Sequence, residues 1–198
     1  GNSEFCDVRL ILQDSPNKNA CPNTGNLTAT LSGKVVNKTA TGFENIAVDL
    51  KNMTDESSMQ STTAQEGKFD FKEVPFFNVY QLKAAKNDDI LNGLSTLDLV
   101  LIQRHILGMK FIENPYDLIA ADINKDKKIT TGDLVQLRQL ILHITNEFPS
   151  NTSWRFVDGA YNFTTNNQMG ENFPEVALED NLSVNQINDF VGVKIGDV

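Results

Sequence analysis

The stretch Asp122-Ile-Asn-Lys-Asp-Lys-Lys-Ile-Thr-Thr-Gly-Asp133 decides how the rest of the chain is interpreted. Oxygen-bearing side chains stand at positions 1, 3, 5, 9 and 12 of these twelve residues. A hard cation such as Ca²⁺ takes about six to eight oxygen ligands, and a loop with this spacing supplies them. The stretch therefore predicts a calcium-binding loop with the ligands Asp122, Asn124, Asp126, Lys128, Thr130 and Asp133.

Each position of this loop has an expected role. Lys128 would offer its backbone carbonyl with its charge pointing away, and Thr130 would bind directly or through water. Ile129 would face inward and pair with its counterpart in a second loop. Lys127 stands where a glycine usually makes the sharp turn, so it must hold a positive φ at some cost. The apolar helix that follows, 134–143, favours this interpretation over an Asx-rich turn that ends in a helix-starting acid.

A second copy of the unit lies upstream. Leu94-Ser-Thr-Leu-Asp98-Leu-Val aligns with Ile129-Thr-Thr-Gly-Asp133-Leu-Val, and duplication at a fixed period indicates a repeated structural unit. In this loop Leu91 offers only a carbonyl where a carboxylate is expected. Either that carbonyl or, in a bulged loop, the Asp88 carboxylate would complete the shell. Counting back from Asp98, the candidate ligands are Asn87, Asp89, Leu91, Gly93, Ser95 and Asp98.

Two loop-helix units joined in this way resemble a type I dockerin, the duplicated calcium-binding module of cellulosome-type assemblies, over about residues 86–145. The resemblance implies two calcium ions and a cohesin-like protein as partner. In that family the partner is read by loop positions 10 and 11 and by residues further along each helix. Here those positions are Thr96, Leu97, Gln103, Arg104, Thr131, Gly132, Arg138 and Gln139. The alternative is that these are ordinary solvated residues of an intramolecular spacer.

The two long helices should pack against each other. We expect calcium to organise the loops so that the helices pack antiparallel through an apolar stripe. A short helix over 116–121, with Pro115 at its start, should deliver Asp122 to its loop. The residues of the stripe are Leu99, Ile102, Ile106, Leu137 and Ile141.

Residues 27–86 show short alternating runs broken by Gly, Asn and Pro, which is typical of a small antiparallel β-sandwich. In the run 42–50, Ile46, Val48 and Leu50 share one face because a strand has a period of two. Further strands are expected at 29–36 and 79–84, and residues 63–75 are expected to form a turn that leads into another alternating strand.

The same region resembles the Cna-B/carboxypeptidase-regulatory-like family of small β-sandwiches. This fold hosts spacers, sugar binders and adhesin stalks alike, so the resemblance implies a fold more than a function. The runs that carry it are Leu-Ser-Gly-Lys-Val (31–35), Glu-Asn-Ile-Ala-Val-Asp-Leu (44–50), Glu-Gly-Lys-Phe-Asp-Phe (66–71) and Tyr-Gln-Leu-Lys-Ala (80–84).

The N-terminal segment, 1–26, holds both cysteines and a possible strand at 5–12. A disulfide between Cys6 and Cys21 would close a loop of about 15 residues, which is worth roughly 3 kcal/mol in the chain-entropy model. The alternative is two free thiols. Such a bridge and calcium loops would both point to a location outside the cytosol.

The C-terminal extension, 147–198, is polar in its middle. Residues 154–157 are expected to form a strand or an anchoring aromatic segment, and 190–198 a final strand. A tail of this length without its own core is either disordered or laid over the preceding modules. Its apolar residues favour packing on those modules, and we expect the parent protein to continue beyond it. Those residues are Trp154, Phe156, Phe173, Phe190 and Val191.

Composition and motifs exclude several functions. The formal net charge of −9 argues against nucleic acid, because phosphate binding needs clustered Lys and Arg. No apolar run is long enough to cross a bilayer, and the sequence has no Gly-x-Ser-x-Gly, phosphate loop or His-Glu-x-x-His motif. We therefore expect a non-enzyme that neither binds nucleic acid nor inserts into membranes.

The predicted fold class is α+β multidomain: a β-sandwich (27–86), an all-α duplicated EF-hand-like calcium module (87–146) and the extension. The predicted function is a calcium-rigidified spacer in a secreted or cell-surface bacterial protein such as an adhesin. The alternative is a docking module for a cohesin-like partner. A third class, a carbohydrate-binding sandwich, would need an aromatic platform, for which the candidates are Phe76, Phe77 and Tyr80.

Overall fold

The computed structural model describes residues 27–164 and 172–198, which form two β-sheets and three α-helices. The expected strand 5–12 and the Cys6–Cys21 bridge lie outside the described residues. In chain order the elements are β1 (Thr28–Asn37), β2 (Ala47–Asn52), β3 (Ser58–Thr62), the short 3-10 turn η1 (Gln65–Gly67), β4 (Lys68–Pro75), β5 (Tyr80–Ala85), α1 (Thr96–Ile106), α2 (Pro115–Ala121), α3 (Thr131–Ile141), β6 (Trp154–Asp158), β7 (Ala177–Glu179), β8 (Gln186–Ile187) and β9 (Phe190–Lys194).

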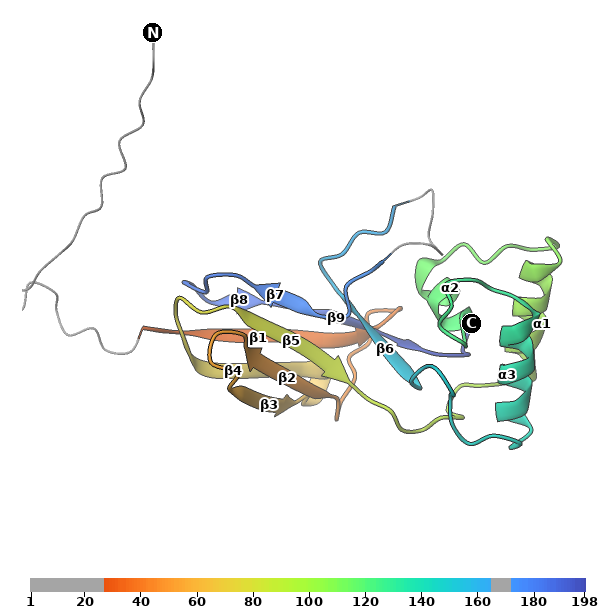
Figure 1. Cartoon of the computed structure of the whole chain (residues 1–198), viewed down its shortest axis with the longest axis horizontal. Coiled ribbons are helices and arrows are strands. Elements are labelled where there is room, and N and C mark those ends of the chain that lie inside the picture. Colours follow the sequence, from red (N-terminus) through yellow and green to blue (C-terminus); the bar gives the residue numbers. More distant parts are fainter. Residues whose placement is uncertain (1–26, 165–171) are drawn as a thin grey trace, which may run out of the picture.

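The two sheets lie at one end of the molecule and the helices at the other (Figure 1). One sheet has the strand order β4-β1-β9-β6, with β8 also paired to β1, and the other has the order β3-β2-β5-β7. Side chains alternate between buried and exposed along β1, β2 and β5. Ile46, Val48 and Leu50 are all buried, which confirms the predicted period-two face.

The C-terminal extension contributes strands to both sheets. β9 lies between β1 and β6, and β7 pairs with the edge of β5. Both β8 and β9 pair with β1 in parallel. The strands within residues 27–86 pair antiparallel, as expected, but the sheets extend beyond this range because the extension adds strands to both. Alternation reveals a buried face but not the partner strand, so these added strands were not foreseen.

The turn and strand expected over 63–75 are present as η1 followed by β4, which begins at Lys68. The chain turns through η1, where Glu66 has φ 61° and Gly67 has φ 72°. A Cβ atom on Gly67 would lie 2.2 Å from the Val35 carbonyl oxygen, so this close approach requires glycine.

A second core joins the helices to the sandwich. Ile102 of α1 and Leu137 of α3 are fully buried, and Leu99, Ile106 and Ile141 pack at the edge of the same cluster, as the stripe predicted. The same core contains Val157 of β6, Val193 of β9, Ile195 directly after β9, and Phe148 from the segment between α3 and β6.

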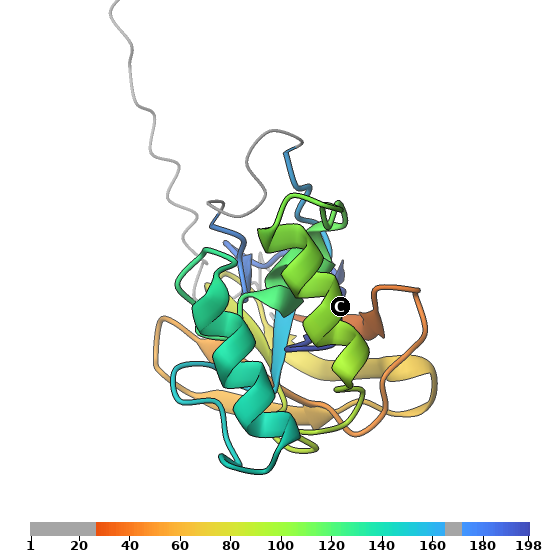
Figure 2. The same ribbon diagram turned by 90° about the vertical axis from the view of Figure 1, so that its right-hand side faces the viewer.

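Figure 2 shows α1 and α3 side by side across the end of the sandwich. Because Val157 of β6 and Val193 of β9 belong to the second core, the helices pack directly against one of the two sheets. None of the helices in the described ranges has the length and apolarity needed to span a bilayer.

Candidate metal centre

The second loop begins where α2 ends. Asn114 caps this helix through a hydrogen bond from the Tyr116 N–H, and Pro115 takes the first helical position. Asp122 follows and is 3% exposed. Its carboxylate accepts the N–H groups of Asp126 at 3.0 Å and Lys127 at 2.9 Å. The loop backbone is therefore curled around the side chain of its first residue.

Asp133 closes the other end of the loop and is 0% exposed. Thr130 is the N-cap of α3 and forms a capping box with Asp133. The Asp133 carboxylate accepts the Thr130 N–H at 2.8 Å and the Asn124 N–H at 3.1 Å. One carboxylate thus ties the start of α3 back to position 3 of the loop.

The remaining side chains of the loop are linked in a chain of short contacts. Asn124 Oδ1 accepts the Asp126 N–H at 2.9 Å, and Asp126 Oδ1 accepts the Lys128 N–H at 2.9 Å. Lys127 has φ 65°, which confirms the expected positive φ at this position. The Lys127 ammonium donates to Asn172, so its charge points out of the loop.

The electrostatics of the loop are those of crowded anions. Burial raises the pKa of Asp122, and the charges of Asp133 and Asp126 add to this effect, while the N–H groups of Lys127 and Asp126 oppose it. Within residues 27–164 and 172–198, no lysine or arginine forms an ion pair with these three carboxylates.

The donor set of the second loop fits a hard cation in its chemistry, since it offers carboxylate, amide, hydroxyl and carbonyl oxygens. Its carboxylates alone are not enough: among the described residues, no group of three or more His, Cys, Asp and Glu side chains is arranged to hold a metal ion. An ion here would also depend on Asn124, Thr130 and the Lys128 carbonyl, and their role as ligands stays a prediction.

The first loop uses its predicted ligands differently. Asn87 Oδ1 accepts the Ser153 N–H at 2.9 Å, and Ser153 Oγ donates to the Asp88 carbonyl at 2.8 Å. Asp98 Oδ1 accepts the Val198 N–H at 3.0 Å, and Oδ2 accepts the Ser95 N–H at 2.7 Å. The C-terminal extension therefore occupies both ends of this loop.

The middle of the first loop is also engaged. Leu91 packs at the edge of the second core, and Gly93 turns the chain with φ 82°. The Lys86 ammonium lies 2.7 Å from an Asp88 carboxylate oxygen and 3.7 Å from one of Asp89. These contacts do not bring the Leu91 carbonyl or the Asp88 carboxylate together with the other predicted ligands. Which of the two would act as the ligand at position 5 therefore stays open.

Three residues that sequence reasoning missed connect the extension and β9 to the loops: Asn151, Ser153 and Lys194. Asn151 Nδ2 donates to the carbonyls of Asp122 and Ile123 at 3.1 and 3.2 Å. Lys194 Nζ donates to the Ile90 carbonyl at 2.8 Å. These hydrogen bonds join residues that are 28 to 104 positions apart in the sequence, so no local sequence pattern predicts them.

The predicted partner-binding residues lie mostly on the surface. Gln139 is half-buried, and the other seven are exposed: Thr96, Leu97, Gln103, Arg104, Thr131, Gly132 and Arg138. The helical half also carries several exposed apolar side chains, namely Leu97, Val100, Leu107, Met109, Phe111, Val135, Leu142 and Ile144.

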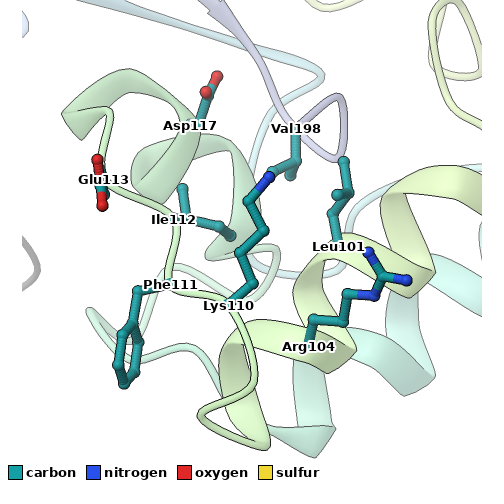
Figure 3. A pocket seen from close by; sticks show the side chains of 8 residues that line it. All are labelled: Leu101, Arg104, Lys110, Phe111, Ile112, Glu113, Asp117 and Val198. Atoms are coloured by element: carbon teal, nitrogen blue, oxygen red, sulfur yellow. The ribbon is translucent and has the colours of Figure 1, made fainter.

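A pocket of about 400 Å³ lies beside α1 and α2 (Figure 3). Figure 3 shows Lys110 extended across it toward Val198, with Arg104 rising from α1 and Asp117 on α2. Leu101 and Ile112 give the pocket an apolar component. Arg104 thus stands in a hollow rather than on a flat face.

The candidate aromatic platform is not a shared surface. Tyr80 is buried in the sandwich core, and its hydroxyl donates to the Pro75 carbonyl at 2.9 Å. Phe77 is exposed, and Phe76 packs against it edge-on with ring centroids 5.8 Å apart. Core packing therefore accounts for Tyr80, as the alternative explanation of these aromatics predicted.

No protein-family model matches the chain, and no curated protein matches it either. Among solved structures, it is similar to the pilus adhesin RrgA of Streptococcus pneumoniae, at 23% identity over 30% of this chain and 7% of that one, with a TM-score of 0.27. The major pilin subunit BcpA of Bacillus cereus matches at 12% identity over 30% of this chain and 19% of that one, with a TM-score of 0.27.

The full-length major pilin SpaD of Corynebacterium diphtheriae matches at 9% identity over 31% of this chain and 21% of that one, with a TM-score of 0.27. The matched part is thus a small share of each of these bacterial surface proteins. Likeness at this level does not establish a common fold or function.

Proposed function

We propose that the chain is a non-catalytic structural module in which a calcium ion at loop 122–133 fixes the helices to the sandwich. The observation that carries this proposal is the pair of buried carboxylates, Asp122 and Asp133, at the two ends of one loop. Both accept backbone N–H groups from the loop, and neither is paired with a cationic side chain in the described residues.

An ion at this position would add the positive charge that these crowded carboxylates lack. The protein's own part is to bring the donors together: α2 ends at Asp122, and Asp133 lies in the first turn of α3. Removing the ion would leave like charges facing one another, so the loop and the start of α3 should loosen.

The shared core supports a role as a spacer. Val157, Val193 and Ile195 belong to the sheet side of the molecule yet pack with Ile102 and Leu137 of the helices. Such a unit resists bending between its two halves, which suits a segment of a secreted or cell-surface bacterial protein such as an adhesin. That location and that parent protein are part of the proposal.

Calcium titration by calorimetry, paired with thermal unfolding in calcium and in EDTA, tests this proposal. Wild type should bind calcium and melt at a higher temperature in its presence, whereas Asp122→Ala should lose both effects. Asp180→Asn, which changes an exposed acid outside the loops, is the matched control and should behave as wild type. Heat-silent titration together with an unchanged melting temperature would exclude calcium stabilisation.

A second candidate function is docking to a cohesin-like partner, and the observation that favours it is the position of Arg104. This residue lines the pocket beside α1 together with Lys110 and apolar side chains. Binding to a cohesin-type domain should disappear in EDTA and in the double variant Arg104→Ala/Arg138→Ala. Lys83→Ala, at an exposed site on the sandwich, is the control. Absence of binding by wild type in calcium would leave the spacer role alone.

A further inference from the structure

We infer that two lysine ammonium groups and the C-terminal extension stand in the first loop, residues 87–98, where the second loop would hold a calcium ion. The first loop then takes up no calcium of its own. This inference concerns the first loop and does not depend on calcium binding at the second.

The first step concerns position 1 of each loop. In the second loop, Asp122 accepts N–H groups from positions 5 and 6, so the backbone wraps around it. In the first loop, Asn87 instead accepts the N–H of Ser153, which lies 66 residues away. The loop's own Asn92 N–H donates to the Asp89 carbonyl at 2.9 Å. The turn of the first loop is therefore closed by a backbone hydrogen bond, and its first side chain accepts no N–H group of the loop in the contacts described.

The second step concerns position 12. Asp133 Oδ1 accepts an N–H from inside its loop, that of Asn124. The equivalent oxygen of Asp98 accepts the N–H of Val198, in the C-terminal extension. The other Asp98 oxygen accepts both the N–H and the hydroxyl of Ser95, at 2.7 and 2.8 Å. Asp133 Oδ2 likewise accepts the N–H and the hydroxyl of Thr130, so the two position-12 carboxylates differ only in the donor to Oδ1. In the second loop that donor belongs to the loop itself, and in the first it belongs to the C-terminal extension.

The third step concerns charge. The Lys86 ammonium pairs with the Asp88 carboxylate at 2.7 Å and lies 3.7 Å from that of Asp89, at the surface of the loop. Lys194 is 6% exposed and donates to the Ile90 carbonyl from below the loop. A divalent ion in this loop would be repelled by both ammonium groups, more strongly by the buried Lys194 than by Lys86, whose partner acids are exposed.

Aromatic rings hold Lys194 in place. Its Nζ lies 5.8 Å from the centroid of Phe148 and 5.6 Å from that of Trp154, within the range of cation–π attraction. Burial lowers the pKa of Lys194 to about 8, while the charges of Asp89, Asp197 and Asp88 act in the opposite direction. The side chain therefore still carries its positive charge at neutral pH.

Calorimetry of the full chain tests the metal part. Wild type should bind one calcium ion, Asp98→Asn should keep that stoichiometry with an affinity within about twofold, and Asp133→Asn should weaken binding at least about tenfold. A second binding event that Asp98→Asn removes would overturn the inference. No binding at all would count against the proposed function alone, and the exchange experiment would then decide the inference.

Hydrogen exchange of the Asn92 and Leu94 amides tests the lysine part, because both donate within the first loop. Lys194→Met should speed their exchange at least about tenfold, equally in calcium and in EDTA. Lys83→Met, on an exposed position of β5, should leave it unchanged. Should Lys194→Met not fold, Lys86→Gln gives the same readout. Unchanged exchange in either folded variant would overturn the assignment.

Discussion

The two loops start from nearly the same local sequence and end in different arrangements. Both lead into helices of 11 residues through capping boxes, Ser95 with Asp98 and Thr130 with Asp133. In the second loop the side-chain oxygens of Asp122 and Asp133 accept N–H groups of the loop itself, whereas in the first loop Asn87 Oδ1 and Asp98 Oδ1 accept N–H groups of the C-terminal extension. A helix start is thus set by its neighbours in sequence, but the use of a carboxylate depends on what the fold brings to it.

The extension touches both loops, and the place of contact separates them. At the second loop, Asn151 binds the backbone carbonyls of Asp122 and Ile123 and leaves the carboxylates to the loop. At the first, Ser153 and Val198 bind the side chains of Asn87 and Asp98. The same extension therefore contacts the backbone of the second loop and the side chains of the first.

The largest expected effect compares Asp133→Ala with Asp98→Ala. Each variant loses a capping box and leaves backbone N–H groups without an acceptor, which should cost about 2 kcal/mol of unfolding free energy in EDTA. At a calcium concentration of 100 Kd, Asp133→Ala also loses the ion's contribution, about 2.7 kcal/mol. The cost of Asp98→Ala should not change with calcium.

Urea unfolding of both variants in calcium and in EDTA measures this difference. Equal calcium dependence in the two variants would remove the distinction between the loops. Loss of stability in neither variant would show that the capping carboxylates are dispensable.

The next effect concerns pH and Lys194. Its pKa is about 8 in the folded protein against an ordinary value of 10.5, so between these values the unfolded chain binds more protons. The free energy of unfolding therefore rises as the pH increases from about 8 to 10.5. The contribution of Lys194 to stability is fully present above pH 10.5 and is lost as the pH falls through 8. The full effect is on the order of 3 kcal/mol. The charged groups facing Lys194 are Asp89, Asp197, Asp88 and Lys86.

Urea unfolding of wild type and Lys194→Met between pH 7 and 10 isolates this term. The free energy of wild type should rise relative to that of the variant as the pH increases. A difference that does not change with pH would mean that Lys194 is not desolvated in the folded state. The first loop would then lack the buried charge that distinguishes it from the second.

A smaller effect should follow from Ser153→Ala. Ser153 is fully buried, and its hydroxyl donates to the Asp88 carbonyl, so the variant leaves that carbonyl unsatisfied at a cost of about 1–2 kcal/mol. Because the contact belongs to the first loop, the cost should be the same in calcium and EDTA. Ser183→Ala, at an exposed site, is the matched control for thermal unfolding. A cost that calcium abolishes would tie Ser153 to a metal site instead.

The sequence was informative where structure is local. The buried face of Ile46, Val48 and Leu50 and the positive φ of Lys127 were predictable, because each depends on residues within a few positions. The helix expected at 134–143 begins earlier, at Thr131, with Asp133 in its first turn as part of the capping box. The two capping boxes were implicit in the same alignment of repeats that revealed the loops.

Long-range pairing was not predictable. β9 enters the sheet between β1 and β6, and nothing in its apolar run specifies a parallel partner more than 150 residues earlier. β3 is polar and mostly exposed, so it lacked the alternation that identifies a strand. The engagement of Asn87 by Ser153 and of Ile90 by Lys194 was hidden for the same reason, since it depends on topology.

The smallest expected effect tests the strained turn of the second loop. Lys127 has φ 65°, a conformation that costs a residue with a side chain energy and that glycine adopts freely. Lys127→Gly should therefore stabilise the protein by about 0.5–1 kcal/mol and tighten calcium binding by a similar amount. Lys128→Gly is the matched control: its φ is not positive, so added backbone freedom should destabilise the loop by about 0.5–1 kcal/mol. Stabilisation by Lys127→Gly together with destabilisation by Lys128→Gly in thermal unfolding would show that the backbone strain at position 6 lowers the stability of the second loop. Changes in the same direction would assign the effect to loss of a lysine charge.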